Sequence, residues 1–292
     1  MTDDILSETA RIVRAELGSD LAAIRVERGV IGLFFTGIKL STGHAGLCAT
    51  PIKEIPEAVC CPSSAMAMPF PGKLTRRSAG DLIDEAVSST GVRRAVGIAT
   101  LNALAEIVAE RRGRAGCEVI EGLDAFDAAE VRAEETAVVV GAFVPFLRAL
   151  RKLGARHWVL EKDPATLKEH ELPYFRPAEA APEVVPQADV LFVTGTTLIN
   201  GTLGELLALA RPDARVAVVG PTVTMIPDAF FARGCHILGG VRVTDPDALL
   251  DVLAEGGSGY HIFGRSAAKV TLRATSRESR APAGHRLADA VG

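Results

Sequence analysis

The sequence predicts an α/β protein in which a parallel sheet covered by helices follows a smaller α+β domain. From Ala137 onward, short apolar segments alternate with helical segments, and repeated strand–helix units form a parallel sheet with helices on both faces. Before Ala137 the pattern is instead a helix, an extended hairpin and further helices. The length of 292 residues agrees, because roughly 150 residues per domain suggests two domains.

The composition supports packed cores and gives no sign of a nucleic-acid or membrane partner. Hydrophobic residues make up 48% of the chain but aromatic residues only 5%, so the cores must consist mainly of Ala, Val, Leu and Ile. A net charge of -4 offers no electrostatic attraction for nucleic acid. No apolar run approaches the ~20 residues of a membrane span, and the acidic N-terminus is unlike a signal peptide. We therefore expect a cytoplasmic protein. The sequence does not specify whether it forms a homo-oligomer.

In the first part of the chain, the spacing of apolar residues predicts one helix, three strands and two further helices. Gly18 follows the first helix as a C-cap, and Arg28-Gly29 is a turn-forming pair between two apolar segments. The stretch Pro51–Gly72 is rich in Pro, Ser, Met and Cys, which predicts a long loop of a functional or mobile kind. The predicted helices are Asp4–Leu17, Ala79–Ser88 and Val92–Arg111, and the strands are Leu21–Glu27, Val30–Ile38 and Ala45–Thr50.

The second part repeats a short apolar strand, a break in small residues and a helix. We divide the chain into residues 1–122, residues 123–272 and a tail, 273–292, that we expect to be disordered. The predicted strands are Ala137–Val140, His157–Leu160, Val190–Val193, Val216–Val219 and His236–Leu238, with helices at Pro145–Leu153, Leu203–Ala210, Pro227–Arg233 and Asp247–Ala254.

The stretch Asp189–Thr202 is the main candidate for a binding site. A buried apolar strand breaks there into small and polar residues before the next helix begins. Open α/β sheets bind ligands at this edge, because glycine lets the backbone approach a ligand and the helix offers unpaired N–H groups. The alternative is a strand-end turn in which Thr and Asn cap helices. The candidate residues are Thr194, Gly195, Thr196, Thr197, Asn200 and Thr202.

Two further strand ends should lie at the same edge of the sheet. Gly141 ends the first parallel strand, and Glu161 follows about 20 positions later, where Rossmann domains hold a ribose diol. The turn reads GAFVP and not GxGxxG, which argues against a dinucleotide, and a salt bridge or solvated strand end is the alternative for Glu161. Gly220-Pro221-Thr222 ends another strand and either adds a hydroxyl to the ligand or forms an ordinary turn.

Four residues of the first part are candidate metal ligands. The five cysteines are an odd number in a chain expected to be cytosolic, which argues against a disulfide framework. Thiolate and imidazole suit a transition metal ion, so His44, Cys48, Cys60 and Cys61 could hold one as a cofactor. Their spacing, H-x3-C-x11-C-C, matches no standard zinc pattern, and buried cysteine is common as a small hydrophobic residue.

The second part is similar to a known family in its strand-end motifs. VVGAFVP, LEKDP, ADVLFVTGTTLINGTL, VVGPTV and LGGVRV have the order and spacing of the DUF364 proteins. AVGIATLNAL resembles the DUF4213 domain that precedes it in that family, so the resemblance covers roughly residues 5 to 265. It implies an enolase-N-terminal-like first domain, a Rossmann-like second domain and a site at their junction, in proteins described as heavy-metal chelation proteins. Asn102 of this stretch faces that site or bonds a loop backbone, since a buried amide needs a partner.

The sequence leads to two hypotheses of function. In the first, the protein binds a metal ion or metal complex between its domains and serves metal homeostasis or metallocofactor assembly. In the second, it is an enzyme acting on a small anionic or adenosyl-type ligand, with Glu161 holding a ribose and the Thr194–Thr202 loop an anionic group. The partner is a metal ion or a small molecule in either case. An interaction protein with a vestigial crevice is a third alternative.

Overall fold

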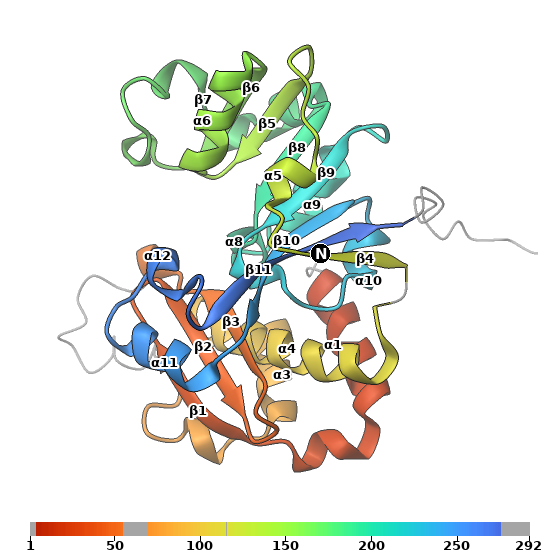
Figure 1. Ribbon diagram of the computed structural model, residues 1–292, viewed down its shortest axis with the longest axis vertical. Helices are drawn as coiled ribbons and strands as arrows, with labels where there is room; N and C mark the ends of the chain where they lie inside the picture. The colour runs from red at the N-terminus through yellow and green to blue at the C-terminus, as the bar shows by residue number, and fades with distance from the viewer. Residues whose placement is uncertain (1–3, 55–68, 115, 276–292) are drawn as a thin grey trace, which may run out of the picture.

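The computed structural model describes residues 4–54, 69–114 and 116–275. These residues form two sheets, which lie one above the other in Figure 1. The predicted α/β class, with a Rossmann-like sheet preceded by a smaller α+β part, is confirmed. The small antiparallel sheet consists of β1 (Val26–Ile31), β2 (Phe35–Leu40) and β3 (Ala45–Ala49). The larger sheet is mostly parallel. In spatial order its strands are β4 (Cys117–Glu121), β11 (Ala267–Ala274), β10 (Ile237–Val243), β9 (Arg215–Val219), β8 (Val190–Thr194), β5 (Thr136–Val140), β6 (Arg156–Glu161) and β7 (Phe175–Pro177).

Helices cover both sheets, as the alternating pattern of the second part predicts. The helices are α1 (Asp4–Leu17), α3 (Ala79–Ser88), α4 (Gly91–Arg112), α5 (Ala125–Ala128), α6 (Val144–Leu153), α7 (Ala181–Val184), α8 (Thr196–Ile199), α9 (Leu203–Leu209), α10 (Asp228–Phe231), α11 (Pro246–Ala254) and α12 (Gly259–Ile262). On the large sheet, α5 and α6 pack on one face, while α7, α9 and α10 pack on the other. α1 and α3 pack on α4 beside the small sheet.

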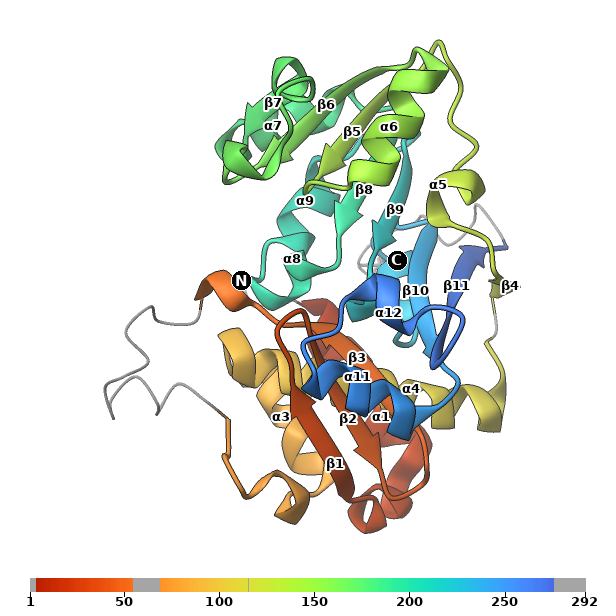
Figure 2. The same ribbon diagram turned by 60° about the vertical axis from the view of Figure 1, so that its left-hand side comes forward.

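Two helices from distant parts of the chain cover opposite faces of the small sheet. α4 lies so close to one face that a Cβ on Gly46 would be 2.2 Å from the carbonyl oxygen of Ala99. α11 covers the other face, where a Cβ on Gly37 would be 2.7 Å from Leu250 Cδ2. Figure 2 shows α11 beside β1 and β2, which come much earlier in the chain.

The predicted hairpin turn at Arg28-Gly29 is wrong. Those residues lie inside β1, where Gly29 pairs with Ile38, and the turn lies at Gly32–Phe34 instead. A Cβ on Gly29 would be only 2.3 Å from Leu74 Cδ2, so this glycine admits a neighbouring side chain. The predicted strand at Leu21–Glu27 is also mostly incorrect, because residues 18–23 form a 3-10 helix. The sequence pattern suggested a turn at Arg28-Gly29 because the residue that packs on Gly29, Leu74, is distant in sequence and leaves no local signal.

The parallel strands have the order of a doubly wound sheet. The first parallel strand in the chain is β5, and β6 and β7 follow on one side of it. The chain then crosses to the other side of β5, where it adds β8, β9 and β10. The connections therefore change direction between β5 and β8. In open α/β sheets, the crevice at such a switch point is where ligands bind.

Two antiparallel strands extend the large sheet beyond the predicted set. β11 pairs with β10 along its whole length, and β4 pairs with β11. The predicted strand end before Gly239-Gly240 is wrong, because both glycines lie within β10 and leave room for Ala125 and Thr224. β4 belongs to the large sheet and α11 covers the small one, so the boundary at residue 122 stays a prediction. Residues 276–292 of the predicted tail lie outside the described residues.

α4 is the central helix of the molecule and is buried on nearly all sides from Ala95 to Ala105. Helices of this kind form the core of a protein. Gly97 lets it approach α3, since a Cβ there would lie 2.2 Å from the backbone nitrogen of Ala86. In the part of the chain that the structure describes, no helix has both the length and the apolar character to cross a membrane.

We expect Gly97→Ala to lower the free energy of unfolding by at least about 2 kcal/mol, because the new methyl group meets rigid backbone and α3 must move away. Gly80→Ala is the matched control on α3. A Cβ there meets nothing closer than 3.7 Å, so the substitution should stabilise the protein by about 0.5 kcal/mol. Urea denaturation gives the free energy of unfolding of both variants. Equal changes in the two variants would contradict the close contact between α3 and α4 at Gly97.

Candidate functional site at the switch point

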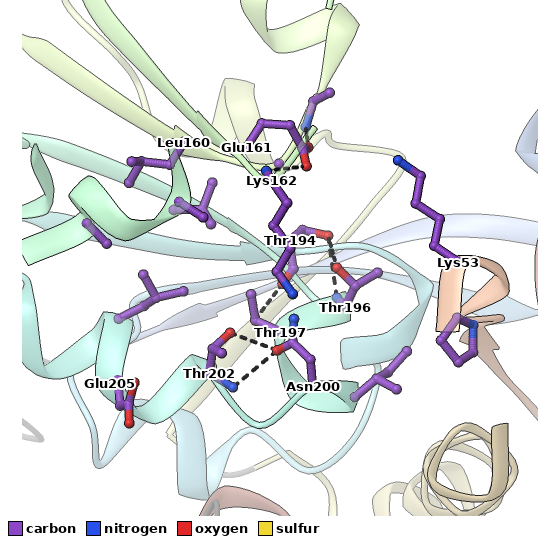
Figure 3. Close-up of a pocket in the computed structure, with 18 of the residues that line it drawn as sticks. Lys53, Leu160, Glu161, Lys162, Thr194, Thr196, Thr197, Asn200, Thr202 and Glu205 are labelled. Atoms are coloured by element: carbon purple, nitrogen blue, oxygen red, sulfur yellow. Dashed lines mark hydrogen bonds between the residues drawn. The ribbon is translucent and has the colours of Figure 1, made fainter. Parts of the chain in front are cut away.

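A pocket of about 800 Å³ lies at the carboxyl ends of β5, β6 and β8 (Figure 3). Its wall is apolar where it meets the sheet and the helices α8 and α9, at Val140, Leu160, Ile199 and Leu206. The segment 50–53, which follows β3 of the small sheet, forms another side of the pocket. The polar residues that line it are Thr50, Lys53, Glu161, Lys162, Glu179, Thr194, Thr196, Thr197, Asn200, Thr202 and Glu205.

Gly141 and Glu161 both line this pocket, as the sequence predicts. Gly141 has a φ of 101°, and a Cβ on it would be 3.1 Å from Thr194, so glycine is required where β5 meets β8. The carboxylate of Glu161 accepts hydrogen bonds from the backbone N–H groups of Ala142 (3.1 Å) and Lys162 (2.8 Å). It therefore fastens the β5–α6 turn to the end of β6.

The amides at the start of α6 are already engaged. Ala142 N–H donates to Glu161, while the N–H groups of Phe143 and Val144 donate to the carbonyl oxygens of Gly141 and Ala142. A dinucleotide-binding turn must instead direct such amides at a pyrophosphate. This geometry agrees with the GAFVP sequence in disfavouring a dinucleotide.

The stretch after β8 forms the short helix α8 directly, where the sequence analysis placed a loop. Thr197 Oγ1 donates to the carbonyl oxygen of Thr194 (2.6 Å), and the Thr194 and Thr196 hydroxyls lie 3.1 Å apart. These threonines thus brace the turn while also lining the pocket, and their contact with a ligand stays a prediction. Gly195 does not line it, because a Cβ there would lie 2.9 Å from Val223.

Gly220, Pro221, Thr222 and Asn102 do not line the pocket. The structure agrees instead with the alternatives, which are an ordinary turn after β9 and, for Asn102, an amide that bonds loop backbone. The turn after β9 faces the first part of the chain, where Thr222 is only 1% exposed and Asn102 only 2%. Asn102 Nδ2 donates to the carbonyl oxygens of Leu47 (2.6 Å), Thr222 (3.1 Å) and Pro221 (3.3 Å). Asn102 therefore connects the small sheet with the turn after β9.

The hydroxyl of Thr222 makes a second connection at this junction. Its Oγ1 accepts a hydrogen bond from the backbone N–H of Ala49 (3.1 Å), at the end of β3. Cys48 lies beside it, with Sγ 3.9 Å from the same oxygen. Because β3 runs on into the segment 50–53, this connection sets where that wall of the pocket stands.

His44 and Cys48 cannot bind one metal ion together. His44 directly precedes β3 and Cys48 lies near its end, so their backbones are about 13 Å apart at ~3.3 Å per residue, whereas ligands of one ion lie within a few ångströms of each other. His44 Nε2 instead lies 3.1 Å from a carboxylate oxygen of Glu110. Burial raises the pKa of the Cys48 thiol, which keeps it protonated and a poor ligand.

The other metal candidates, Cys60 and Cys61, lie outside the described residues. Within residues 4–54, 69–114 and 116–275, no three His, Cys, Asp or Glu side chains gather as an ion would require. Burial also raises the pKa of Cys235, to about 12. The described side chains therefore do not fit a thiolate or imidazole metal centre.

Apart from Glu161, sequence reasoning missed the charged residues of the pocket. Lys53 of the first part forms an ion pair with Asp163 (2.9 Å), just after β6, and so connects the two parts at the pocket. Figure 3 shows the Lys162 side chain extending into the pocket. Lys162 directly follows Glu161 at a strand end, so its place at the carboxyl edge was readable from the sequence. Lys53, Glu179 and Glu205 do not directly follow a predicted strand of the parallel sheet, so no sequence pattern placed them at the pocket.

The fold and the pocket define a protein with a doubly wound, Rossmann-like sheet and a small-molecule-sized crevice at its switch point. The chain belongs to the DUF364 family. The family model, described as "Putative heavy-metal chelation", matches residues 124–272. The DUF4213 model, with the same description, matches residues 14–105.

Solved structures of this family have the same fold. A DUF364-family protein of unknown function from Pyrococcus horikoshii is 18% identical, with a TM-score of 0.71 over 92% of this chain and 99% of that one. Another, from Desulfitobacterium hafniense DCB-2, is 22% identical, with a TM-score of 0.67 over 91% and 99%. An uncharacterized protein of Methanocaldococcus jannaschii is 27% identical over 174 residues, which span 58% of this chain and 62% of that protein.

We expect Asn102→Leu to lower the free energy of unfolding by about 2 kcal/mol or more, because carbonyl oxygens of Leu47 and Thr222 lose a buried donor. The chain's other asparagine, Asn200, is exposed, and Asn200→Leu should change stability by less than about 0.5 kcal/mol. Chemical denaturation gives both values. Similar small losses in the two variants would contradict the structural role of Asn102.

Proposed function

We propose that the protein binds a small organic ligand together with a metal ion, so that the metal complex and not the bare ion is its cargo. The observation that carries this proposal is the pocket at the switch point, which combines an apolar wall with hydroxyl, amide, ammonium and carboxylate groups. Its volume of about 800 Å³ falls in the range of small-molecule sites, ~300–1,000 Å³. The family description supplies the connection to metals.

The side chains of the pocket support a complex over a bare ion. A protein site for a soft or borderline ion gathers thiolates and imidazoles within about 2.0–2.3 Å of the metal. Neither group lines this pocket among the described residues. Threonine hydroxyls, an asparagine amide and a lysine ammonium instead suit the oxygen and nitrogen atoms of an organic molecule. Such a complex serves chelation or delivery in metal homeostasis, or the assembly of a metallocofactor.

An enzyme acting on an adenosyl-type ligand is the second candidate, and one observation favours it. Glu161 ends β6 beside the switch point, which is where Rossmann domains hold a ribose. Its carboxylate already accepts two backbone hydrogen bonds, and the α6 amides are occupied. Binding of S-adenosylmethionine that is lost in Glu161→Ala would favour this second candidate.

The proposal is tested by equilibrium dialysis with Ni²⁺ and Zn²⁺, each given as the aquo ion and as its complex with L-histidine or citrate. We expect about one complex per chain to be retained, with metal and organic ligand in a constant ratio by elemental analysis and mass spectrometry. Thr196→Trp, which places a bulky ring in the pocket, should abolish retention. Arg148→Trp, on the exposed surface of α6, is the control and should retain the complex.

Retention of the aquo ions without any organic ligand, unchanged in Thr196→Trp, would contradict the proposal. That result would indicate that the metal ion binds to ligands outside the pocket. Circular dichroism of both tryptophan variants distinguishes loss of binding from loss of folding.

A further inference from the structure

The side-chain amide of Asn200 is oriented with its NH₂ group free. Its oxygen Oδ1 accepts hydrogen bonds from the backbone N–H of Thr202 (3.2 Å) and from Thr202 Oγ1 (2.7 Å). The amide oxygen is therefore held on the side of Thr202, and the NH₂ group points into the pocket in Figure 3. Among the described residues, that group donates to no protein acceptor, so it is available to a ligand.

The turn that carries Asn200 is fixed from the other part of the molecule. Arg94 of α4 donates through Nη1 to the carbonyl oxygen of Ile199 (3.2 Å) at the end of α8. Its Nε donates to the carbonyl oxygen of Ser89 (2.6 Å), which holds the guanidinium in place. Gly201 follows with a φ of 76°, a conformation that favours glycine. Asn200 is thus positioned before a ligand arrives, which lowers the entropic cost of binding.

Lys162 supplies a positive charge on the same side of the pocket. Its side chain extends toward Asn200 in Figure 3. Within the described part of the chain, its ammonium forms no hydrogen bond or ion pair. The neighbouring charges are engaged elsewhere, since Glu161 accepts from two backbone N–H groups and Lys53 pairs with Asp163. The Lys162 ammonium is therefore the free cation of the pocket among the described residues.

We propose that Lys162 and Asn200 form a subsite for a carboxylate group of the ligand. This inference rests on the proposed function and names the chemical class of the molecule that binds. An ammonium and an amide NH₂ can donate to the two oxygens of a carboxylate, and one positive charge balances one negative charge. Glu179 and Glu205 also line the pocket and disfavour a dianion such as phosphate. They suit a ligand whose remaining groups are neutral or cationic, as in a carboxylate-bearing metal complex.

The subsite is tested without metal, by titrating ¹⁵N-labelled protein with acetate, L-histidine, histamine and inorganic phosphate. Acetate and L-histidine carry the carboxylate, and histamine is L-histidine without it. We expect both carboxylates to shift the Asn200 side-chain NH₂ signals saturably, while histamine does not and phosphate binds more weakly. Lys162→Ala should weaken L-histidine binding about tenfold, the effect of losing one charge-assisted hydrogen bond. Asn200→Asp should weaken it further, because a donor becomes a repelling carboxylate.

Lys152→Ala, an exposed lysine of α6, is the matched control and should leave the affinity unchanged. Both substituted residues are exposed, so melting temperatures should stay near that of the wild type. The subsite is overturned if neither carboxylate shifts the Asn200 signals, if Lys162→Ala binds L-histidine as well as the wild type, or if phosphate or histamine binds more tightly.

The two proposals fail separately. If the carboxylates bind as described and no metal complex is retained in dialysis, the subsite stands and the metal function fails. If Lys162→Ala retains the metal complexes as well as the wild type does, the metal function stands and the carboxylate subsite fails.

Discussion

The hydrogen bonds of the Asn102 amide are the interactions on which the arrangement of this molecule depends. A single buried side chain connects α4 with the middle of β3 and with the turn after β9. Thr222 adds the bond to Ala49, and β3 then continues into the segment that forms one wall of the pocket. The same central helix fixes the Asn200 turn through Arg94. The shape of the pocket is therefore set by contacts between the two sheets, and neither part alone contains it.

Much of the fold was predictable because its signals are local. Parallel strands buried on both faces appear as apolar runs, and helices such as α1 appear in their periodicity, so the strand–helix alternation was clear. The misplaced glycine turns and the missed strands share one physical cause, which is contact between residues distant in sequence. Gly29 and Gly239-Gly240 lie within strands because Leu74, Ala125 and Thr224 pack against them. β11 and β4 pair with each other across about 150 residues, and no local pattern records that pairing.

The site was predictable to the level of strand ends but not of side-chain directions. Gly141, Glu161 and the Thr194–Thr202 stretch lie at the crevice because carboxyl ends of parallel strands share one edge. Thr222 ends a strand in the same way, yet its turn faces the small sheet, which a sequence alone could not reveal. The cysteines gave the least reliable signal. Cys48 packs as a buried, protonated thiol, while the charged residues Lys53, Glu179 and Glu205 line the pocket without any motif.

The most direct measurement of the central claim is the crystal structure of the protein grown with the Ni²⁺ complex of L-histidine, with diffraction recorded at the nickel absorption edge. Our account places the anomalous peak inside the pocket between the ends of β5 and β8. Density for the amino acid should extend from the metal to Lys162 and Asn200. Nickel found only at surface groups such as His44 and Glu110, with no organic density in the pocket, would contradict it.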